Sequence, residues 1–275
     1  MQSIRLLLLF VLACVPPLAE AKSAPTPPYK VVIDPGHGGT DLGAVQIIDG
    51  YRVAEKDITL AIARKLVHLL RQRGIDGVLT RKEDEDIPLP ERTAFANRIG
   101  ADLFISLHMN STPHPHQPKS GLPEAQGVET YILNTATDAT SKRLAQLENM
   151  GLSIEKTVVD SDVSLILKDL TLDGNLAESM RLACALQNEV VSATSPPPLR
   201  KLRNRGVRQA LFYVLLGANM PSALLEIGFL SHAFDRKLAG QKQGQDLLAE
   251  SISKAITRFR GVSGATTRLA SCKIH

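Results

Sequence analysis

The sequence predicts an α/β fold, in which a mixed, mostly parallel, twisted sheet is covered by helices on both faces and carries an all-helical insertion. Short apolar segments alternate with longer helical patterns along most of the 275 residues. These short segments are apolar throughout, as in strands that are buried on both faces. Between residues 141 and 191 the alternation stops, because this segment is rich in helix formers and holds no clear strand.

The first half of the chain supplies three strands and two helices. Residues 30–36, KVVIDPG, predict a strand, since three β-branched residues precede a proline and a glycine. A helix over 57–73 follows, with apolar residues at helical spacing on one face and a glycine at the stop position. The second strand is 77–81, the second helix is 89–100 and again ends at a glycine, and the third strand is the apolar run 101–110.

The second half places further strands around the helical insertion. Apolar runs predict strands at 127–133, 212–217 and 222–230. The insertion, 141–191, separates the first of these strands from the others. We expect one domain over 29–260, followed by a polar and flexible tail over 261–275.

The N-terminus has the features of an export signal. Arg5 is followed by the apolar run LLLLFVLACV and then by PPLAEA, which offers an A-x-A cleavage site. We predict a signal peptide over 1–21 and a proline-rich linker over 22–28. The apolar run is too short to span a bilayer, so we expect an exported protein without a transmembrane segment in the mature chain. An oxidising compartment would permit one bridge between Cys184 and Cys272, and an unpaired Cys272 in the polar tail is the alternative.

The composition is that of an ordinary globular protein and does not favour nucleic-acid binding. The chain is 44% hydrophobic and 22% charged, with a formal net charge of +4. It has no tryptophan and no dense Lys/Arg run interleaved with aromatic residues. A basic cluster does follow the prolines at 196–198, and we expect it to be a solvated loop rather than a phosphate-binding patch. Its members are Arg200, Lys201, Arg203, Arg205 and Arg208.

Four titratable residues stand where an α/β sheet positions its ligands, at the carboxyl ends of strands. His37 follows the first strand, His108 ends the third, Glu226 lies in the last, and Glu55 precedes the first helix. Two histidines and one carboxylate are a common catalytic zinc set with an open fourth position, and a further glutamate can accept a proton from water. Glu226 points to function most strongly, because a carboxylate inside an apolar run needs a partner or a role.

Other interpretations of these residues stay open at this point. Each histidine could be a hydrogen-bonded structural residue, and Glu55 could be a solvated carboxylate at a helix start. The glycines around His37 could cradle a phosphate, but neither G-x-x-x-x-G-K-[ST] nor G-x-G-x-x-G is present. The remaining histidines have weaker patterns: His68, His114, His116, His232 and His275.

The motifs that carry the four residues resemble the zinc-dependent N-acetylmuramoyl-L-alanine amidases of bacterial cell-wall remodelling, the type-3 amidase family. The matching stretches are VVIDPGHGGTDLGA, EKDITLAIARKL, LPERTAFANRIGADLFISLHMN, GVETYIL, NRGVRQA and MPSALLEIGFLSH. The resemblance implies that His37, Glu55 and His108 bind Zn²⁺ and that Glu226 is the catalytic glutamate. It implies cleavage of the amide between N-acetylmuramic acid and L-alanine of peptidoglycan in the periplasm, for wall remodelling and daughter-cell separation.

The glycine-rich turn has a matching explanation. Glycines beside His37 would let a bulky glycan-peptide approach the metal without side-chain clashes. We expect Asp34 to support the His37 turn by hydrogen bonds.

The helical insertion resembles a regulatory segment of the cell-separation subgroup of this family. In that subgroup the insertion covers the zinc site until an activator protein with a degenerate metallopeptidase-like domain displaces it. SKRLAQLENMG is similar to the start of that segment, and we take Glu148 as the candidate autoinhibitory ligand. Ser141 can cap the helix, so that Leu144, Leu147 and Glu148 share one face and the leucines pack on the core. A solvated Glu148 is the alternative, with other candidate ligands at Glu155, Asp160 and Asp162.

Two other functions compete with the amidase. A zinc peptidase that cuts within the stem peptide would use the same residues. A wall-binding module that had lost catalysis would keep the fold, but it would have no need of a buried base at Glu226.

Overall fold

The computed structural model describes residues 28–112, 125–136, 138–151, 175–192, 202–261 and Cys272. The predicted signal peptide over 1–21 and the linker up to residue 27 lie outside this part of the chain. So does most of the predicted tail.

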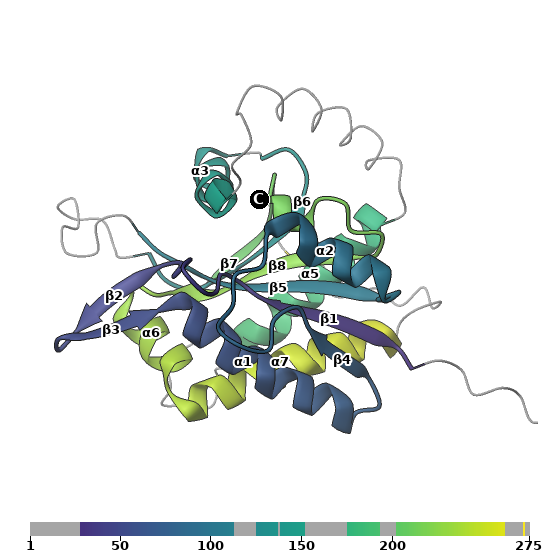
Figure 1. Cartoon of the computed structure of the whole chain (residues 1–275), viewed down its shortest axis with the longest axis horizontal. Helices are drawn as coiled ribbons and strands as arrows, with labels where there is room; N and C mark the ends of the chain where they lie inside the picture. Colours follow the sequence, from purple (N-terminus) through teal and green to yellow (C-terminus); the bar gives the residue numbers. More distant parts are fainter. Residues whose placement is uncertain are drawn as a thin grey trace, which may run out of the picture.

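A six-stranded sheet forms the centre of the molecule, with the strand order β4-β1-β5-β8-β6-β7 (Figure 1). Every neighbouring pair runs parallel except β6 and β8, which are antiparallel. This confirms the prediction of a mixed, mostly parallel sheet. Its strands are β1 (Lys30–Pro35), β4 (Asp76–Leu79), β5 (Leu103–Asn110), β6 (Val128–Leu133), β7 (Asn204–Ala210) and β8 (Ser222–Phe229). A separate hairpin pairs β2 (Val45–Ile48) with β3 (Tyr51–Ala54).

Helices cover both faces of the sheet, as predicted. On one face lie α1 (Glu55–Gln72), α5 (Asn175–Ser192), α6 (Ala233–Gly240) and α7 (Lys242–Gly261); on the other lie α2 (Leu89–Arg98) and α3 (Ala139–Glu148) (Figure 1). Because successive strand residues point to opposite faces, Val31 and Ile33 join the core beneath the first group, whereas Val32 packs toward α2 and α3. The sheet therefore has an apolar core on each side, and the second core includes Val32 of β1 and Phe104 of β5.

The strand predicted at 212–217 is wrong. This segment contains the short 3-10 helix η2 (Tyr213–Leu215), and the edge strand is β7 instead. The apolar side chains of Phe212, Val214 and Leu215 pack into the core on the α2 side, so their burial does not require pairing in the sheet. An edge strand, in contrast, needs few apolar residues, and in β7 Val207 and Ala210 suffice.

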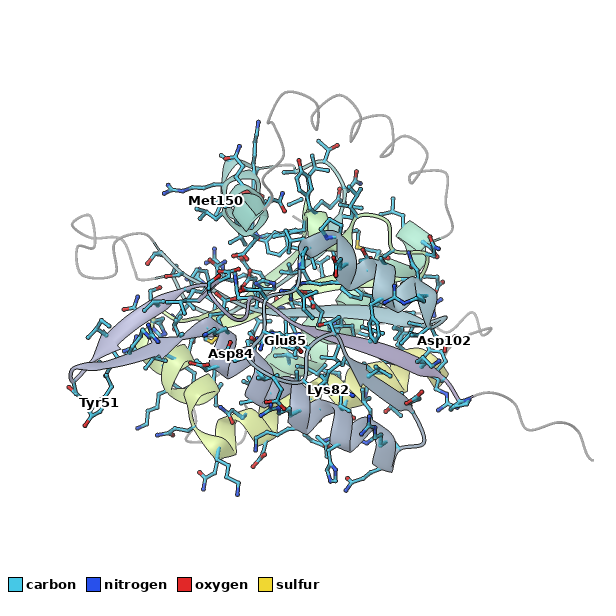
Figure 2. All side chains as sticks on the ribbon, viewed as in Figure 1. Tyr51, Lys82, Asp84, Glu85, Asp102 and Met150 are labelled. Atoms are coloured by element: carbon cyan, nitrogen blue, oxygen red, sulfur yellow. A yellow bond between two sulfur atoms is a disulfide. The ribbon has the colours of Figure 1, made fainter. Side chains whose placement is uncertain are left out.

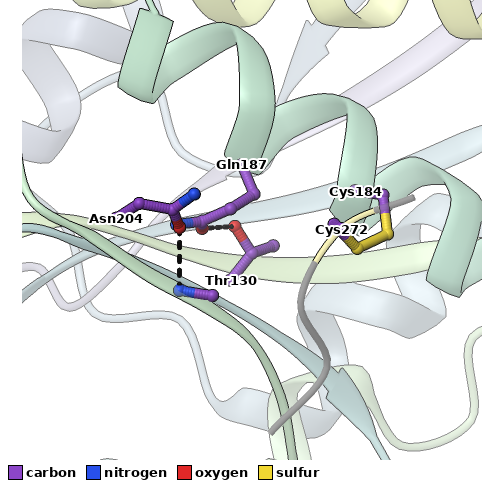
Figure 3. The surroundings of a disulfide bond; sticks show 6 residues. Thr130, Cys184, Gln187, Asn204 and Cys272 are labelled. Atoms are coloured by element: carbon purple, nitrogen blue, oxygen red, sulfur yellow. Dashed lines mark hydrogen bonds between the residues drawn. A yellow bond between two sulfur atoms is a disulfide. The ribbon is translucent and has the colours of Figure 1, made fainter. Parts of the chain in front are cut away.

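The predicted extent of the helical insertion, 141–191, also needs correction. Helix α5 packs against β6, β8 and α7 on the face of the sheet away from α3. Gln187 in α5 is fully buried and donates to the carbonyl of Val128 at 2.8 Å, while its Oε1 accepts from the Thr130 hydroxyl at 2.7 Å (Figure 3). Residues 175–191 are thus part of the core. Residues 152–174, with Glu155, Asp160 and Asp162, lie outside the described residues.

A disulfide joins Cys184 of α5 to Cys272 in the C-terminal tail (Figure 3). The two cysteines are 88 residues apart in the sequence. The sequence left their pairing open. The bond fixes one point of the tail to the buried helix, so the tail is not free at Cys272.

We predict that reduction of this bond destabilises the protein. A covalent link across such a long loop limits the unfolded chain, and removal of a disulfide of this kind costs about 2–5 kcal/mol. Urea unfolding with and without reductant measures the change. The double variant Cys184→Ala/Cys272→Ala is the control, because its stability should not respond to reductant. Equal stability of oxidised and reduced wild-type protein would contradict the prediction.

Candidate metal centre and active site

The turn after β1 is shaped for close packing around His37. A Cβ atom added at Gly36 would lie 2.5 Å from the His108 ring, and one added at Gly43 would lie 2.5 Å from the His37 ring and 2.6 Å from Glu55 Oε2. His37 itself has a φ of 58°, which is uncommon for a residue with a side chain. The glycines therefore make room for the site's own side chains, whereas the sequence had suggested room for substrate.

Buried polar side chains brace this turn from below. Asp34 is fully buried and accepts from Thr80 at 2.6 Å, from Ser106 at 2.7 Å and from Arg92 at 2.9 Å. Burial alone raises the pKa of Asp34, but the Arg92 guanidinium and the two hydroxyl donors hold it below its ordinary value. Arg92 also donates to the His37 carbonyl at 3.1 Å. Asp34 thus supports the His37 turn as expected, through Arg92.

A second brace comes from the loop that follows β4, in which Figure 2 labels Lys82, Asp84 and Glu85. Asp84 accepts from the Gly39 amide at 2.8 Å and from Lys56 Nζ at 2.7 Å. Arg81 is almost fully buried and donates to the carbonyls of Pro35 and Gly36, each at 2.9 Å. The backbone on both sides of His37 is therefore held in place from this loop.

Three predicted ligands converge at the carboxyl ends of β1 and β5. Glu55 Oε1 lies 3.1 Å from His37 Nε2 and 3.0 Å from His108 Nδ1. Glu55 stands at the first position of α1, and its two oxygens also accept from the amides of Met109 and Ala44, each at 2.8 Å. These backbone bonds fix the carboxylate between the two imidazoles.

Glu148 reaches the same point from α3, on the opposite side. Its Oε2 lies 3.3 Å from His37 Nε2 and 3.1 Å from His108 Nδ1. Leu144 and Ala145 of α3 are buried against the core, and Glu148 follows them at i+4 and i+3. The carboxylate therefore points down onto the histidines, as the helical spacing suggested.

Two details of α3 differ from the sequence prediction. Leu147 is 46% exposed rather than packed on the core, because Ala145 takes the inward position beside Leu144. The N-cap is Asp138, whose Oδ1 accepts from the Thr140 and Ser141 amides at 2.9 Å, so the helix begins earlier than a cap at Ser141 allows.

The site fits a zinc ion. His37 Nε2, His108 Nδ1 and Glu148 Oε2 are buried without a hydrogen-bond partner, and these three atoms lie within 4.8 Å of one another. Unpartnered buried polar atoms are costly, and ligation of a metal removes that cost. Nitrogen and carboxylate donors suit zinc. Asp41 Oδ2 lies 2.8 Å from His37 Nδ1, which orients the ring and directs Nε2 to the centre.

The charges of the same groups favour a cation. Burial lowers the pKa of both histidines, but the carboxylates of Glu55 and Asp41 beside His37, and of Glu148 beside His108, outweigh burial and raise both pKa values, that of His108 to about 10. Burial raises the pKa values of Glu55 and Glu148, and the neighbouring histidines lower them below the ordinary value. The carboxylates of Glu55 and Glu148 thus favour positive charge at the point where they meet.

Glu226 lies on the next strand, beside His108 in the register of β5 and β8. It is fully buried, and neither carboxylate oxygen has a hydrogen-bond partner. Burial, together with the carboxylates of Glu148, Glu55 and Glu129, raises its pKa well above the ordinary value. A raised pKa makes this carboxylate a stronger proton acceptor, and it lies beside the histidines.

The model of the N-acetylmuramoyl-L-alanine amidase family matches residues 31–258, which include this whole site.

This chain belongs to that amidase family.

The amidase is similar to characterised relatives over most of its length. It is 32% identical to N-acetylmuramoyl-L-alanine amidase AmiA of Escherichia coli over 234 residues, which are 83% of this chain and 75% of AmiA. Identity to AmiC of Neisseria meningitidis is also 32%, over 85% of this chain and 53% of AmiC, so the chain spans about half of that relative.

Solved structures agree with the fold. An N-acetylmuramoyl-L-alanine amidase of Clostridium difficile 630 is 30% identical and superposes with a TM-score of 0.62, covering 87% of this chain and all of the other. AmiC2 of Nostoc punctiforme is 28% identical, with a TM-score of 0.58 over 84% of this chain and 97% of its own.

Sequence reasoning missed several residues around the amidase site. Asp41 carried a usable signal, because it follows His37 by four residues within the same glycine-rich turn. Arg92 carried none, because only the fold brings its helix to the site, whereas Glu129 carried the same signal as Glu226, a charged residue inside an apolar run. Glu129 pairs with Glu226 across β6 and β8, and only the strand order brings them together.

Proposed function

We propose that this amidase hydrolyses the amide between the lactyl group of N-acetylmuramic acid and L-alanine of peptidoglycan, with Zn²⁺ held by His37, Glu55 and His108. The observation that supports it is the meeting of unpartnered His37 Nε2 and His108 Nδ1 with the Glu55 carboxylate, in a chain of this family. These three ligands leave the fourth coordination position of zinc open, and the Glu148 carboxylate lies at that point.

The residues divide the chemistry between them. When bound, zinc would supply Lewis acidity that lowers the pKa of a water molecule toward about 7 and polarises the amide carbonyl. Glu226 takes a proton from the attacking water and passes it to the nitrogen of L-alanine as the C–N bond breaks. The lactyl group stays on the glycan and ends as a carboxylate, and the stem peptide is released with a free amine on L-alanine. Asp41 holds the His37 ring in place throughout.

Product analysis tests this function against the alternatives. Mass spectrometry of digested sacculi should find glycan with free lactyl groups and intact stem peptides that begin with L-alanine. Peptides cut within the stem would indicate a zinc peptidase. Binding to sacculi with no released product, even after α3 has been released from the site, would indicate a wall-binding module.

We propose further that α3 holds the enzyme inactive by placing Glu148 in the open zinc position. Both ends of α3 are attached to β7 or to the residues that directly follow it. At its start Asp138 Oδ2 accepts from Arg208 at 3.0 Å. At its end Asn149 donates to the Leu211 carbonyl at 2.7 Å and accepts from the Tyr213 amide at 2.9 Å. A carboxylate held here excludes the nucleophilic water.

We predict that Glu148→Ala raises basal activity on sacculi. Loss of a charged contact weakens the closed state by about 1.5–3 kcal/mol, which corresponds to about tenfold or more in the open population. Gln146→Ala is the matched control, because Gln146 is exposed on the same helix. Glu148→Ala activity at or below the wild-type level would refute autoinhibition through this residue.

An activator would act by binding the open state preferentially. Leu147 near the end of α3 and Met150, which follows the helix and is labelled in Figure 2, are both exposed. We propose that the activator is a protein with a degenerate metallopeptidase-like domain, and that the enzyme is exported to the periplasm by the leader over 1–21. Within the described residues, no helix has the length and apolar character that a membrane crossing requires.

A further inference from the structure

The basic cluster of the sequence does not form a solvated loop throughout. Arg205 and Arg208 lie on β7 and are partly buried. Arg208 pairs with Tyr131 of β6, whose ring belongs to the core beneath α3. The side chain of Arg208 therefore lies on the face of the sheet that carries Glu226 and Glu129, and the expectation of a solvated loop is wrong for these two residues.

Arg205 is held in place by a carboxylate and an aromatic ring. Its Nε donates to Glu129 Oε1 at 2.5 Å, and its guanidinium lies 5.1 Å from the centre of the Phe229 ring. Glu129 accepts from two further donors, Asn110 at 3.1 Å and the Tyr131 hydroxyl at 2.8 Å. This buried carboxylate is therefore neutralised by Arg205 and needs no second arginine.

Arg208, in contrast, has a buried donor atom that is not used. Its Nε is buried without a hydrogen-bond partner and lies 3.6 Å from Glu129 Oε1. Within the described part of the chain, its hydrogen bond goes to Asp138 Oδ2, the cap of α3. An arginine offers five N–H donors in a planar fork that matches a carboxylate. When α3 leaves the site, Asp138 leaves with it, and Arg208 keeps only the 3.6 Å ion pair with Glu129, with the outer end of its guanidinium group open to a ligand.

The chemistry of the substrate supplies an anion for this cation. The lactyl carboxyl group is tied up in the scissile amide, so the fixed negative charge of a muramoyl peptide lies on the stem. Its second residue is acidic and is joined through the side-chain carboxyl group, which leaves an α-carboxylate free. Adjacent strands are about 4.8 Å apart, so β7 lies about 10 Å from β8 and Glu226. Two extended residues span about 7 Å, and the arginine side chain covers the remainder.

We propose that Arg208 is a specificity residue that binds the α-carboxylate of the second stem residue, and that Asp138 occupies it in the closed state. This inference rests on the proposed amidase function and deepens it. Helix α3 and the substrate thus compete at two points. Glu148 competes for the zinc position, and Asp138 competes for Arg208.

The proposal is tested with a pair of muramoyl pentapeptides. One carries the free α-carboxylate on the second stem residue, and the other carries a carboxamide there. The full-length wild-type enzyme should prefer the carboxylate in kcat/KM by about tenfold or more, as a charged hydrogen bond provides. Arg208→Gln should reduce this ratio to near one. The ratio is taken within each variant, so a change in the open population affects both substrates equally and cancels.

Two matched variants separate specificity from other effects. Arg203→Gln removes the same charge from an exposed residue near the start of β7 and should keep the ratio. Asp138→Asn frees Arg208 and should raise activity on both substrates while the ratio stays. A wild-type ratio near one, or an unchanged ratio in Arg208→Gln, would overturn the proposal and leave the amidase function intact.

A binding measurement removes the dependence on turnover. Calorimetric titration of both pentapeptides into Glu226→Gln, and into Glu226→Gln/Arg208→Gln, should show the carboxylate preference in the first protein alone. Equal Kd values in both proteins would reject the role of Arg208 whatever the activity assays show. If neither pentapeptide is cleaved by any variant while the preference in Kd persists, the amidase function fails and the carboxylate site stands.

Discussion

Glu226→Gln should keep the fold of this enzyme and the proposed zinc, and should lose nearly all activity. The glutamine side chain has the same size, but its amide cannot accept a proton from water. Loss of a general base costs about 10²–10⁴-fold in rate. The measurement is product release from sacculi in the Glu148→Ala background, in which we expect α3 to leave the site and no longer to limit the rate.

Two controls accompany this variant. Zinc content and the thermal unfolding midpoint should match those of the parent, since Glu226 is not among the proposed ligands and its two oxygens have no hydrogen-bond partner to lose. A rate close to that of the parent would assign Glu226 a structural role and reject the mechanism.

His37→Ala and His108→Ala should each abolish stoichiometric zinc binding and, with it, activity. The two imidazoles are the nitrogen donors of the proposed zinc site, and a catalytic zinc needs three protein ligands. Elemental analysis of purified protein should fall from about one zinc per chain to far below one. His68→Ala is the matched control, because His68 is an exposed histidine on α1. Full zinc occupancy in both site variants would place the metal elsewhere.

The sequence was most informative where chemistry and strand ends coincide. His37 and His108 follow buried apolar strands, and parallel strands bring their carboxyl ends to one edge, so their meeting was predictable. Glu226 was identifiable because a charged residue interrupts an apolar run. The direction of Glu148 followed from helical spacing, although the same reasoning placed Leu147 on the core, where Ala145 packs instead.

What the sequence concealed depends on tertiary neighbours. The polar segment Asn204–Ala210 has the composition of a loop, yet it pairs with the free edge of β6 as a strand, which places Arg208 on the face of the sheet that carries Glu226. The role of α5 in the core was hidden, because its helix formers suit an insertion and a core helix equally. The β2–β3 hairpin did carry a local sequence signal, the dipeptide Asp49-Gly50. Both residues have a positive φ, as this type of two-residue turn requires.

The proposed zinc site is tested most sharply by a crystal structure with anomalous diffraction measured on both sides of the zinc absorption edge. We expect one peak that appears above the edge, with His37 Nε2, His108 Nδ1 and a Glu55 oxygen at about 2.0–2.2 Å. In crystals of protein shown by elemental analysis to contain zinc, absence of a peak at this position, or a peak ligated by other residues, would contradict it.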